Sequence, residues 1–135
     1  MIFLWDLRKP SKPLSENKDS DSCIMTLDFC NDQRYIVSGT LDGVLNVLDT
    51  ETNKMMVDYQ TLDDRSSALS NVIYSVKSVK THPFKDTTKN TFMIGCENKM
   101  VSVCDFDPDT QHDFHRLQTH GKYVGHSSSI RRVNF

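Results

Sequence analysis

The chain has 135 residues and a mass of 15.5 kDa, with 16 basic and 18 acidic side chains that leave a net charge of −2. This length fits a single domain, and 37% hydrophobic with 25% charged residues is typical of a globular protein. A balanced charge argues against a nucleic-acid-binding protein, which usually carries a basic stripe.

Targeting features are weak in this sequence. The longest apolar run, Met1–Trp5, is shorter than a membrane span or the core of a signal peptide. Four cysteines are too few for a disulfide scaffold, which agrees with a reducing compartment. We therefore expect a cytoplasmic or nuclear protein that is not secreted and does not bind membranes.

Short apolar runs bounded by Gly, Asn, Asp or Pro predict strands along the whole chain, with no helical period between them. Asp42-Gly43 lies between two of these runs and is typical of a hairpin, because both central residues must tolerate positive φ. The sequence therefore predicts an all-β fold. In chain order the predicted strands are 2–6, 24–29, 35–39, 45–49, a run that begins after 51–53, then 76–81, 91–95, 101–105 and 130–135.

These predicted strands recur in the same order, so the chain contains an internal repeat. In a first column of equivalent apolar positions, Val76 falls in line with Ile24 and Ile130. A second column aligns 35–39 with 91–95, and a third aligns 45–49 with 101–105 and with 2–6. A unit of four short antiparallel strands, a to d, repeated every 43 to 56 residues, is typical of one blade of a β-propeller.

Three motifs in these positions resemble the WD40 repeat. They are Trp5-Asp6 at the end of an apolar strand, the segment 38–43 (Ser-Gly-Thr-Leu-Asp-Gly) between strands b and c, and Gly125-His126 shortly before Ile130. The expected structural repeat signature comprises Trp5, Asp6, Ser38, Gly39, Asp42, Gly43, Asp49, Gly95, Asp105, Gly125 and His126.

The resemblance implies a buried hydrogen-bonded network in each blade, built from a His, an Asp of the b–c turn, a Ser or Thr of strand b and the Trp of strand c. Such a network stabilises a blade only when its members are all present. The sequence departs from this pattern: Leu48 and Cys104 replace Trp, Ser20 and Val72 replace His, and Asn98 replaces the second Asp. We expect degenerate blades that depend on apolar packing.

The repeat divides the chain into parts of four blades. We expect 1–21 to be the end of a first blade, 22–62 a second blade, 63–119 a third blade with loop insertions, and 120–135 the start of a fourth. The fold class is thus a partial WD40-type β-propeller, with about two complete four-stranded blades and parts of two flanking blades. No ring closes within this chain, because even four blades need about 160 residues.

An open arc of blades would expose strand edges and apolar faces. Two explanations remain open. Either the sequence is a piece of a longer protein or an incomplete gene model, or the chain assembles with further chains that complete the ring.

Two segments contain possible metal ligands, but neither has the spacing of a known metal-binding motif. His112, His115, His120 and His126 lie close together, but no cysteine or carboxylate supports them at a ligand spacing. The segment 105–116 begins like a calcium-binding loop, yet Thr110 replaces the required glycine and Arg116 the final glutamate. We therefore predict no metal site.

Catalytic and cofactor signals are also missing from the sequence. No nucleophile elbow occurs, and Cys96 and Cys104 fall in predicted strands, where a small apolar filler is the simpler interpretation. The five glycines are isolated and form no phosphate-binding loop. We expect no catalytic residue, no cofactor and no small-molecule substrate.

The WD40 resemblance implies a non-catalytic scaffold that mediates protein–protein interaction through the propeller faces and the loops at blade ends. The polar segments 9–22, 58–71 and 85–89 are interpreted as solvated loops, or alternatively as partner contacts. Two other functions stay open. Segment 121–128 is similar to the echinoderm microtubule-associated-protein-like family, which implies a microtubule-associated propeller, and the propeller could instead be attached to a catalytic domain outside this chain.

Overall fold

A computed structural model describes residues 1–18, 21–30, 33–60, 72–78, 90–97, 99, 101–109, 117–123 and 125–133 of the chain. All regular elements in these residues are strands, and no helix long and apolar enough to cross a membrane occurs among them. The strands are β1 (Ile2–Leu4), β2 (Ser15–Asn17), β3 (Ile24–Phe29), β4 (Tyr35–Thr40), β5 (Val44–Asp49), β6 (Lys54–Gln60), β7 (Ile73–Ser78), β8 (Asn90–Cys96), β9 (Val101–Phe106) and β10 (Leu117–Tyr123).

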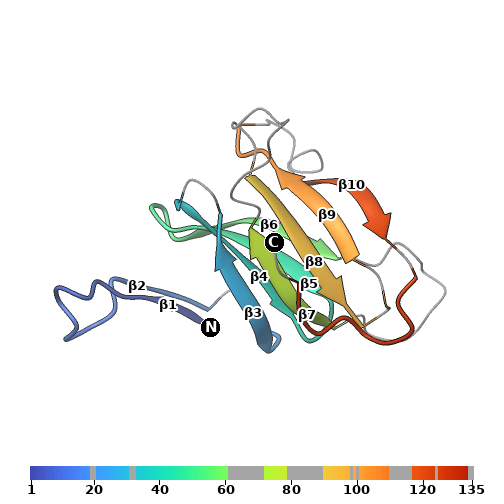
Figure 1. The fold of residues 1–135 in the computed structure, drawn as a ribbon. Coiled ribbons are helices and arrows are strands. Elements are labelled where there is room, and N and C mark those ends of the chain that lie inside the picture. The colour runs from blue at the N-terminus through green and yellow to red at the C-terminus, as the bar shows by residue number, and fades with distance from the viewer. Residues whose placement is uncertain are drawn as a thin grey trace.

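The strands form two four-stranded antiparallel sheets and one two-stranded ribbon. One sheet has the order β3-β4-β5-β6, the other β7-β8-β9-β10, and β1 pairs with β2. Figure 1 shows the two sheets side by side, with β7 next to β3 and β4, against which it packs, and the β1–β2 ribbon extending from the β3 side. Each sheet is a simple meander of strands a to d, which is the arrangement expected for a blade.

The main core lies between the two sheets, since its buried side chains come from both of them. The strands β4 and β8 are buried along nearly their whole length, which explains why their sequences are almost continuously apolar. Tyr35 of the first sheet meets Phe106 of the second edge to face, with ring centroids 5.1 Å apart. The buried side chains of this core are Cys30, Tyr35, Val37, Leu45, Val47, Ile73, Val76, Phe92, Ile94, Cys96, Cys104 and Phe106.

A smaller core joins the ribbon to the opposite face of the first sheet. Ile2 of β1 packs with Ile36 and Leu48, and the partly buried Ile24 and Met55 complete the cluster. Asn53 adds a polar contact, since its side-chain amide donates a hydrogen bond to the carbonyl of Glu16, at 3.0 Å. These contacts agree with the prediction that the ribbon represents strands c and d of a preceding blade.

The strand registers confirm the second predicted column, and they confirm the third column for 45–49 and 101–105. The alignment of these segments with 2–6 stays a prediction. Tyr35 pairs with Asp49 as Thr91 pairs with Asp105, and the paired residues Gly39 and Leu45 have Gly95 and Val101 as their counterparts.

The first predicted column, which aligned Val76 with Ile24 and Ile130, is wrong for the third blade. Ile24 pairs with Thr40 and Ile73 pairs with Cys96, and in each case a bulge follows in strand a. Ile73, not Val76, is therefore the counterpart of Ile24, and Val76 is the counterpart of Leu27. The blade boundary expected at 119 also falls inside a strand, because β10 continues to Tyr123.

The meander places the connections of a blade at two opposite ends. In the first sheet the a–b and c–d connections lie at one end, termed here the c–d end, and the b–c turn lies at the other, termed the b–c end. Residues 5–14, which join β1 to β2, lie at the c–d end of their own ribbon. Candidate functional groups therefore fall at one end or the other, or on the faces between blades.

Candidate functional site

The first recurrent arrangement is a contact between successive blades, formed by Thr26 of β3 and Gly39 of β4, which are direct cross-strand partners. A Cβ on Gly39 would lie only 2.8 Å from the Cβ of Ile73, so Ile73 sits directly on the glycine backbone. Three residues later, Val76 N–H donates to the Thr26 hydroxyl at 3.2 Å. We term this hydroxyl–glycine pair the interblade socket.

The same socket occurs one blade further along the chain. Ser75 pairs with Gly95 across β7 and β8. A Cβ on Gly95 would lie 2.9 Å from Cγ2 of Ile130, and Val133 N–H donates to the Ser75 hydroxyl at 3.1 Å. Ile130 and Val133 lie outside any described strand, yet they make the same contacts as Ile73 and Val76. Gly39 and Gly95, predicted as signature residues, thus have a steric role between blades.

At the b–c end of the first sheet, a hydroxyl and a carboxylate organise the hairpin turn. The Thr40 hydroxyl contacts the Asp42 carboxylate and accepts a hydrogen bond from Val44 N–H at 2.9 Å, while Gly43 adopts a φ of 82°. This hydroxyl contact lowers the pKa of Asp42, and a second bond from the Ser22 side chain acts in the same direction.

This blade therefore has polar contacts at its b–c turn in addition to the apolar packing that the sequence predicts. The strand b hydroxyl that meets Asp42 belongs to Thr40 and not to the predicted Ser38, which is buried two residues earlier. Ser22 contributes from the segment before strand a. The positions Ser20 and Asn98, where the sequence departs from the WD40 pattern, lie outside the described residues.

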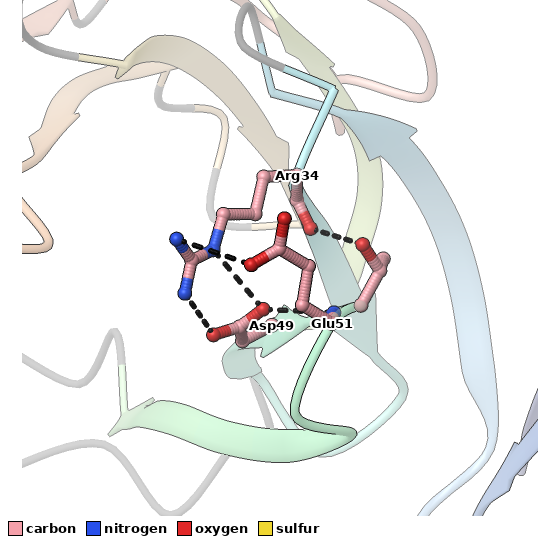
Figure 2. Close-up of polar contacts among 4 residues, drawn as sticks. Arg34, Asp49 and Glu51 are labelled. Atoms are coloured by element: carbon pink, nitrogen blue, oxygen red, sulfur yellow. Dashed lines mark hydrogen bonds and ion pairs between the residues drawn. The ribbon is translucent and has the colours of Figure 1, made fainter.

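At the c–d end, Asp49 is held by a guanidinium (Figure 2). Nη2 of Arg34 lies 2.8 Å from Oδ2 of Asp49, Nε lies 3.3 Å from Oδ1, and Nη1 lies 3.3 Å from Oε2 of Glu51. The guanidinium carbon also lies 5.3 Å from the ring centroid of Tyr35. These contacts join the a–b connection to the c–d turn.

The chemistry of this cluster is structural. The Asp49 side chain is only 3% exposed, and the hydrogen bonds from Arg34 lower its pKa to about 2. The same pair raises the pKa of Arg34. Both the Arg34 and the Asp49 charge are thus fixed near neutral pH.

Asp105 holds the equivalent position in the second sheet but uses a neutral partner. The Thr91 hydroxyl donates to Oδ1 of Asp105 at 2.6 Å, and both residues are buried. Asn90 stands where the first sheet has Arg34. Arg34 and Thr91 were absent from the predicted signature. Thr91 lies directly across from Asp105 and could have been found from the strand register, whereas Arg34 precedes β4, and the residue directly across from Asp49 is Tyr35.

The remaining signature residues do not form a buried network in the described residues. Trp5 is 48% exposed, and Asp6 is bonded to Arg8, with 2.9 Å from Nη2 to Oδ2, a contact that lowers the pKa of Asp6. Gly125, at a φ of 135°, has no atom within 4 Å of its would-be Cβ, and His126 is exposed.

Groups of three or more His, Cys, Asp or Glu with metal-binding geometry do not occur among the described residues. His112 and His115 lie outside them, and the side chain of His120 is not described. Cys96 and Cys104 are buried, and burial raises the pKa of Cys96 to about 11, so its thiol stays protonated. Both fit the predicted role of apolar filler.

Exposed apolar side chains gather in two places. One group lies on the β1–β2 ribbon and its connection, the other on β3, and single residues lie elsewhere. They are Phe3 (47% exposed), Trp5 (48%), Leu7 (91%) and Leu14 (63%) in the first group, and Met25 (44%), Leu27 (51%) and Phe29 (41%) in the second. We term the second group the β3 apolar row.

Comparisons with known proteins bear on the fold. No family model matches the chain. It is 28% identical over 133 residues to maintenance of telomere capping protein 5 from Saccharomyces cerevisiae, and the match covers 96% of this chain but only 11% of that protein. These comparisons do not support the similarity of segment 121–128 to the echinoderm microtubule-associated-protein-like family.

Solved WD40 structures share the architecture at low sequence identity. The RRP9 WD40 repeats and U3-55K each align over 83% of this chain and 29% of their own, with a TM-score of 0.60 and 12% identity. The β-propeller domain of Cps50 (Swd1), with the source name Myceliophteria thermophila, aligns over 76% with a TM-score of 0.56. The chain therefore has the all-β fold of a partial WD40-type β-propeller, and its described strands close no ring.

Proposed function

We propose that this chain is part of a non-catalytic WD40-repeat scaffold that mediates protein–protein interaction, and that it belongs to a longer propeller protein. The observation that carries the proposal is the connection between β1 and β2, which presents Leu7 and Leu14 at exposed fractions of 91% and 63%. Large apolar side chains exposed together mark contact surfaces more often than solvated loops.

The backbone of this connection is held in a defined shape. Leu14 N–H donates to the carbonyl of Leu4 at 2.7 Å, and Lys9 N–H donates to the carbonyl of Asp6 at 2.9 Å. Arg8 is tied to the Asp6 carboxylate, with a guanidinium side chain that is 89% exposed. Because the apolar groups project from a turn that is already ordered, a partner would not have to pay much entropy to bind them.

The comparisons support a longer polypeptide. The chain spans about a tenth of the curated relative that it matches and less than a third of the solved propellers. Binding at the loops of blade ends, without a cofactor, agrees with the structural roles found for Asp49, Asp105 and the buried cysteines. We place this scaffold in the cytoplasm or nucleus.

The test is affinity capture with the full-length polypeptide, followed by quantitative mass spectrometry. The double variant Leu7→Asp/Leu14→Asp is compared with the wild type and with Leu41→Asp, which changes an exposed leucine (45%) at the b–c end. We expect the double variant alone to lose at least ten-fold of one or more captured proteins. Equal capture by the wild type and the double variant would remove this surface as the interaction site.

The microtubule-associated alternative rests on segment 121–128, and no contact in the described residues favours it. Attachment to a catalytic domain concerns polypeptide outside this chain and is equally without support in its described residues.

A further inference from the structure

The β3 apolar row is exposed at positions that are buried in the next blades. Leu27, Val76 and Val133 occupy equivalent positions in three successive strand a segments, with exposed fractions of 51%, 3% and 8%. Val76 is covered because β7 packs against β3 and β4 of the preceding blade. Leu27 has no such cover, since the described part of the preceding blade consists only of β1 and β2, its outer strands.

On the face of the first sheet that would meet a preceding blade, the ribbon covers part of β4 and β5 but leaves the β3 apolar row exposed. Ile2 of β1 reaches Ile36 and Leu48, which lie on β4 and β5. The β3 apolar row lies on strand a, and the equivalent strand of the next blade, β7, is covered by β3 and β4. Two more strands beside the free edge of β1 would cover the row, and a meander of the observed kind places them in chain order just before β1.

The interblade socket shows which chemistry those strands need. In both described interfaces an isoleucine sits on a glycine, and an N–H three residues later donates to a hydroxyl directly across from that glycine. Ile24 and Leu27 have the same spacing and the same register on β4 as Ile73 and Val76 have on β8. The Leu27 N–H therefore points away from β4, toward the uncovered side, as that of Val76 does.

We propose that the β3 apolar row is the docking surface for two antiparallel strands of the same polypeptide that lie outside these 135 residues, and that these strands provide a third interblade socket. Their inner strand carries a Ser or Thr whose hydroxyl accepts the Leu27 N–H. Their second strand carries a glycine directly across from it, on which Ile24 sits. The remaining surface contacts Leu27 and Phe29 with apolar side chains, because this face has to exclude water as the next one does.

This inference rests on the longer propeller polypeptide proposed above and not on its partner-binding role. Its test is photo-cross-linking in the full-length polypeptide, with p-benzoylphenylalanine in place of Phe29, an aromatic replacement at a residue that is 41% exposed here. The matched control carries the same group in place of Leu41, at 45%. No binding partner is needed, so the result is independent of the affinity capture.

We expect the residue 29 probe to form an intramolecular cross-link to a peptide outside 1–135 that contains a Ser or Thr in one strand and a glycine in the strand paired with it. The Leu41 probe should not reach that peptide. A cross-link to a second copy, to a different protein or to a peptide without this pair overturns the proposal, and so does the absence of any cross-link.

A second measurement serves if the probe disturbs folding. In the full-length polypeptide, Leu27→Asp should lower the Tm by about 3–8 °C because it places a carboxylate under the docked strands, whereas Leu41→Asp should leave the Tm within about 1 °C. Equal Tm values for the two variants would show that Leu27 faces water in the complete protein, which contradicts the proposal.

Discussion

Arg34 binds two carboxylates of very different exposure: the Asp49 side chain is 3% exposed, and that of Glu51 is 67% exposed. Two guanidinium nitrogens serve the buried carboxylate and one serves the exposed one (Figure 2). The two acidic residues therefore provide a matched pair for measuring how burial changes the contribution of an ion pair.

Asp49→Asn should reduce the free energy of unfolding of the full-length polypeptide by about 1–3 kcal/mol, because it removes a charged acceptor from a buried, doubly bonded site. Glu51→Gln should cost less than about 1 kcal/mol, since exposed ion pairs contribute little. Urea denaturation followed by tryptophan fluorescence or circular dichroism measures both. Similar losses for the two variants would contradict the structural role assigned to Asp49.

Acid should weaken the fold through the same carboxylate. The pKa of Asp49 is lowered to about 2 in the folded chain, whereas an unfolded Asp titrates near 3.9. A lowered pKa adds stability that is complete above the unfolded value and is lost as the pH falls toward the folded value. The urea concentration at the unfolding midpoint should therefore decrease as the pH is lowered from about 4 to about 2. This decrease should be smaller in Asp49→Asn. A midpoint with the same pH dependence in both proteins would exclude Asp49 as the cause.

The socket hydroxyl can be tested by an isosteric change. Thr26→Val keeps the shape of the side chain but removes the acceptor of the Val76 N–H, so we expect a loss of about 1–3 kcal/mol in the free energy of unfolding. Thr26→Ser keeps the hydroxyl and should lose less. The hydrogen-bond assignment fails if valine is tolerated as well as serine.

The socket glycine makes a steric prediction. Gly39→Ala places a Cβ against Ile73, and overpacking of this kind costs about 1–3 kcal/mol. Ile73→Ala removes Cγ2 but keeps the Cβ of residue 73, so the cost of Gly39→Ala should shrink in part in that background. A double-mutant cycle measures the coupling, and strictly additive effects would contradict direct contact between the two residues.

The isolated 135-residue chain should self-associate, because the β3 apolar row is open to water. Sedimentation velocity should show oligomers for the wild type and for Leu41→Asp, and a shift toward monomer for Leu27→Asp. A well-dispersed wild-type monomer at the same concentration would contradict the open-arc interpretation.

The sequence predicted the blade strands well where residues are enclosed on both faces. β4, β5, β8 and β9 read as short apolar runs, and their mutual register follows from Asp49 and Asp105 at the ends of strand c. The error at β7 has a physical reason. Ile73 and Val76 have the same three-residue spacing as Val76 and Val79, so the apolar pattern fits two registers, and only packing on Gly39 selects the first.

The polar contacts were less predictable. Ser38 and Thr40 are two residues apart on one strand and therefore share a face, so the sequence does not show which hydroxyl meets Asp42. Arg34 lies before strand b, and its bond to Asp49 depends on bringing together residues 15 positions apart. Contacts of this kind come from strand register, which a single sequence specifies weakly at strand ends.

The two sockets also bear on the order in which the protein folds during synthesis. Hydrogen bonds within a blade join neighbouring strands, whereas the Thr26–Val76 and Ser75–Val133 bonds span 50 and 58 residues. Local hairpins close quickly and distant contacts slowly, so each blade should form as a meander while its socket stays empty. A ribosome that releases the chain at about 5–20 residues per second leaves that socket open for several seconds, until the next isoleucine emerges to fill it.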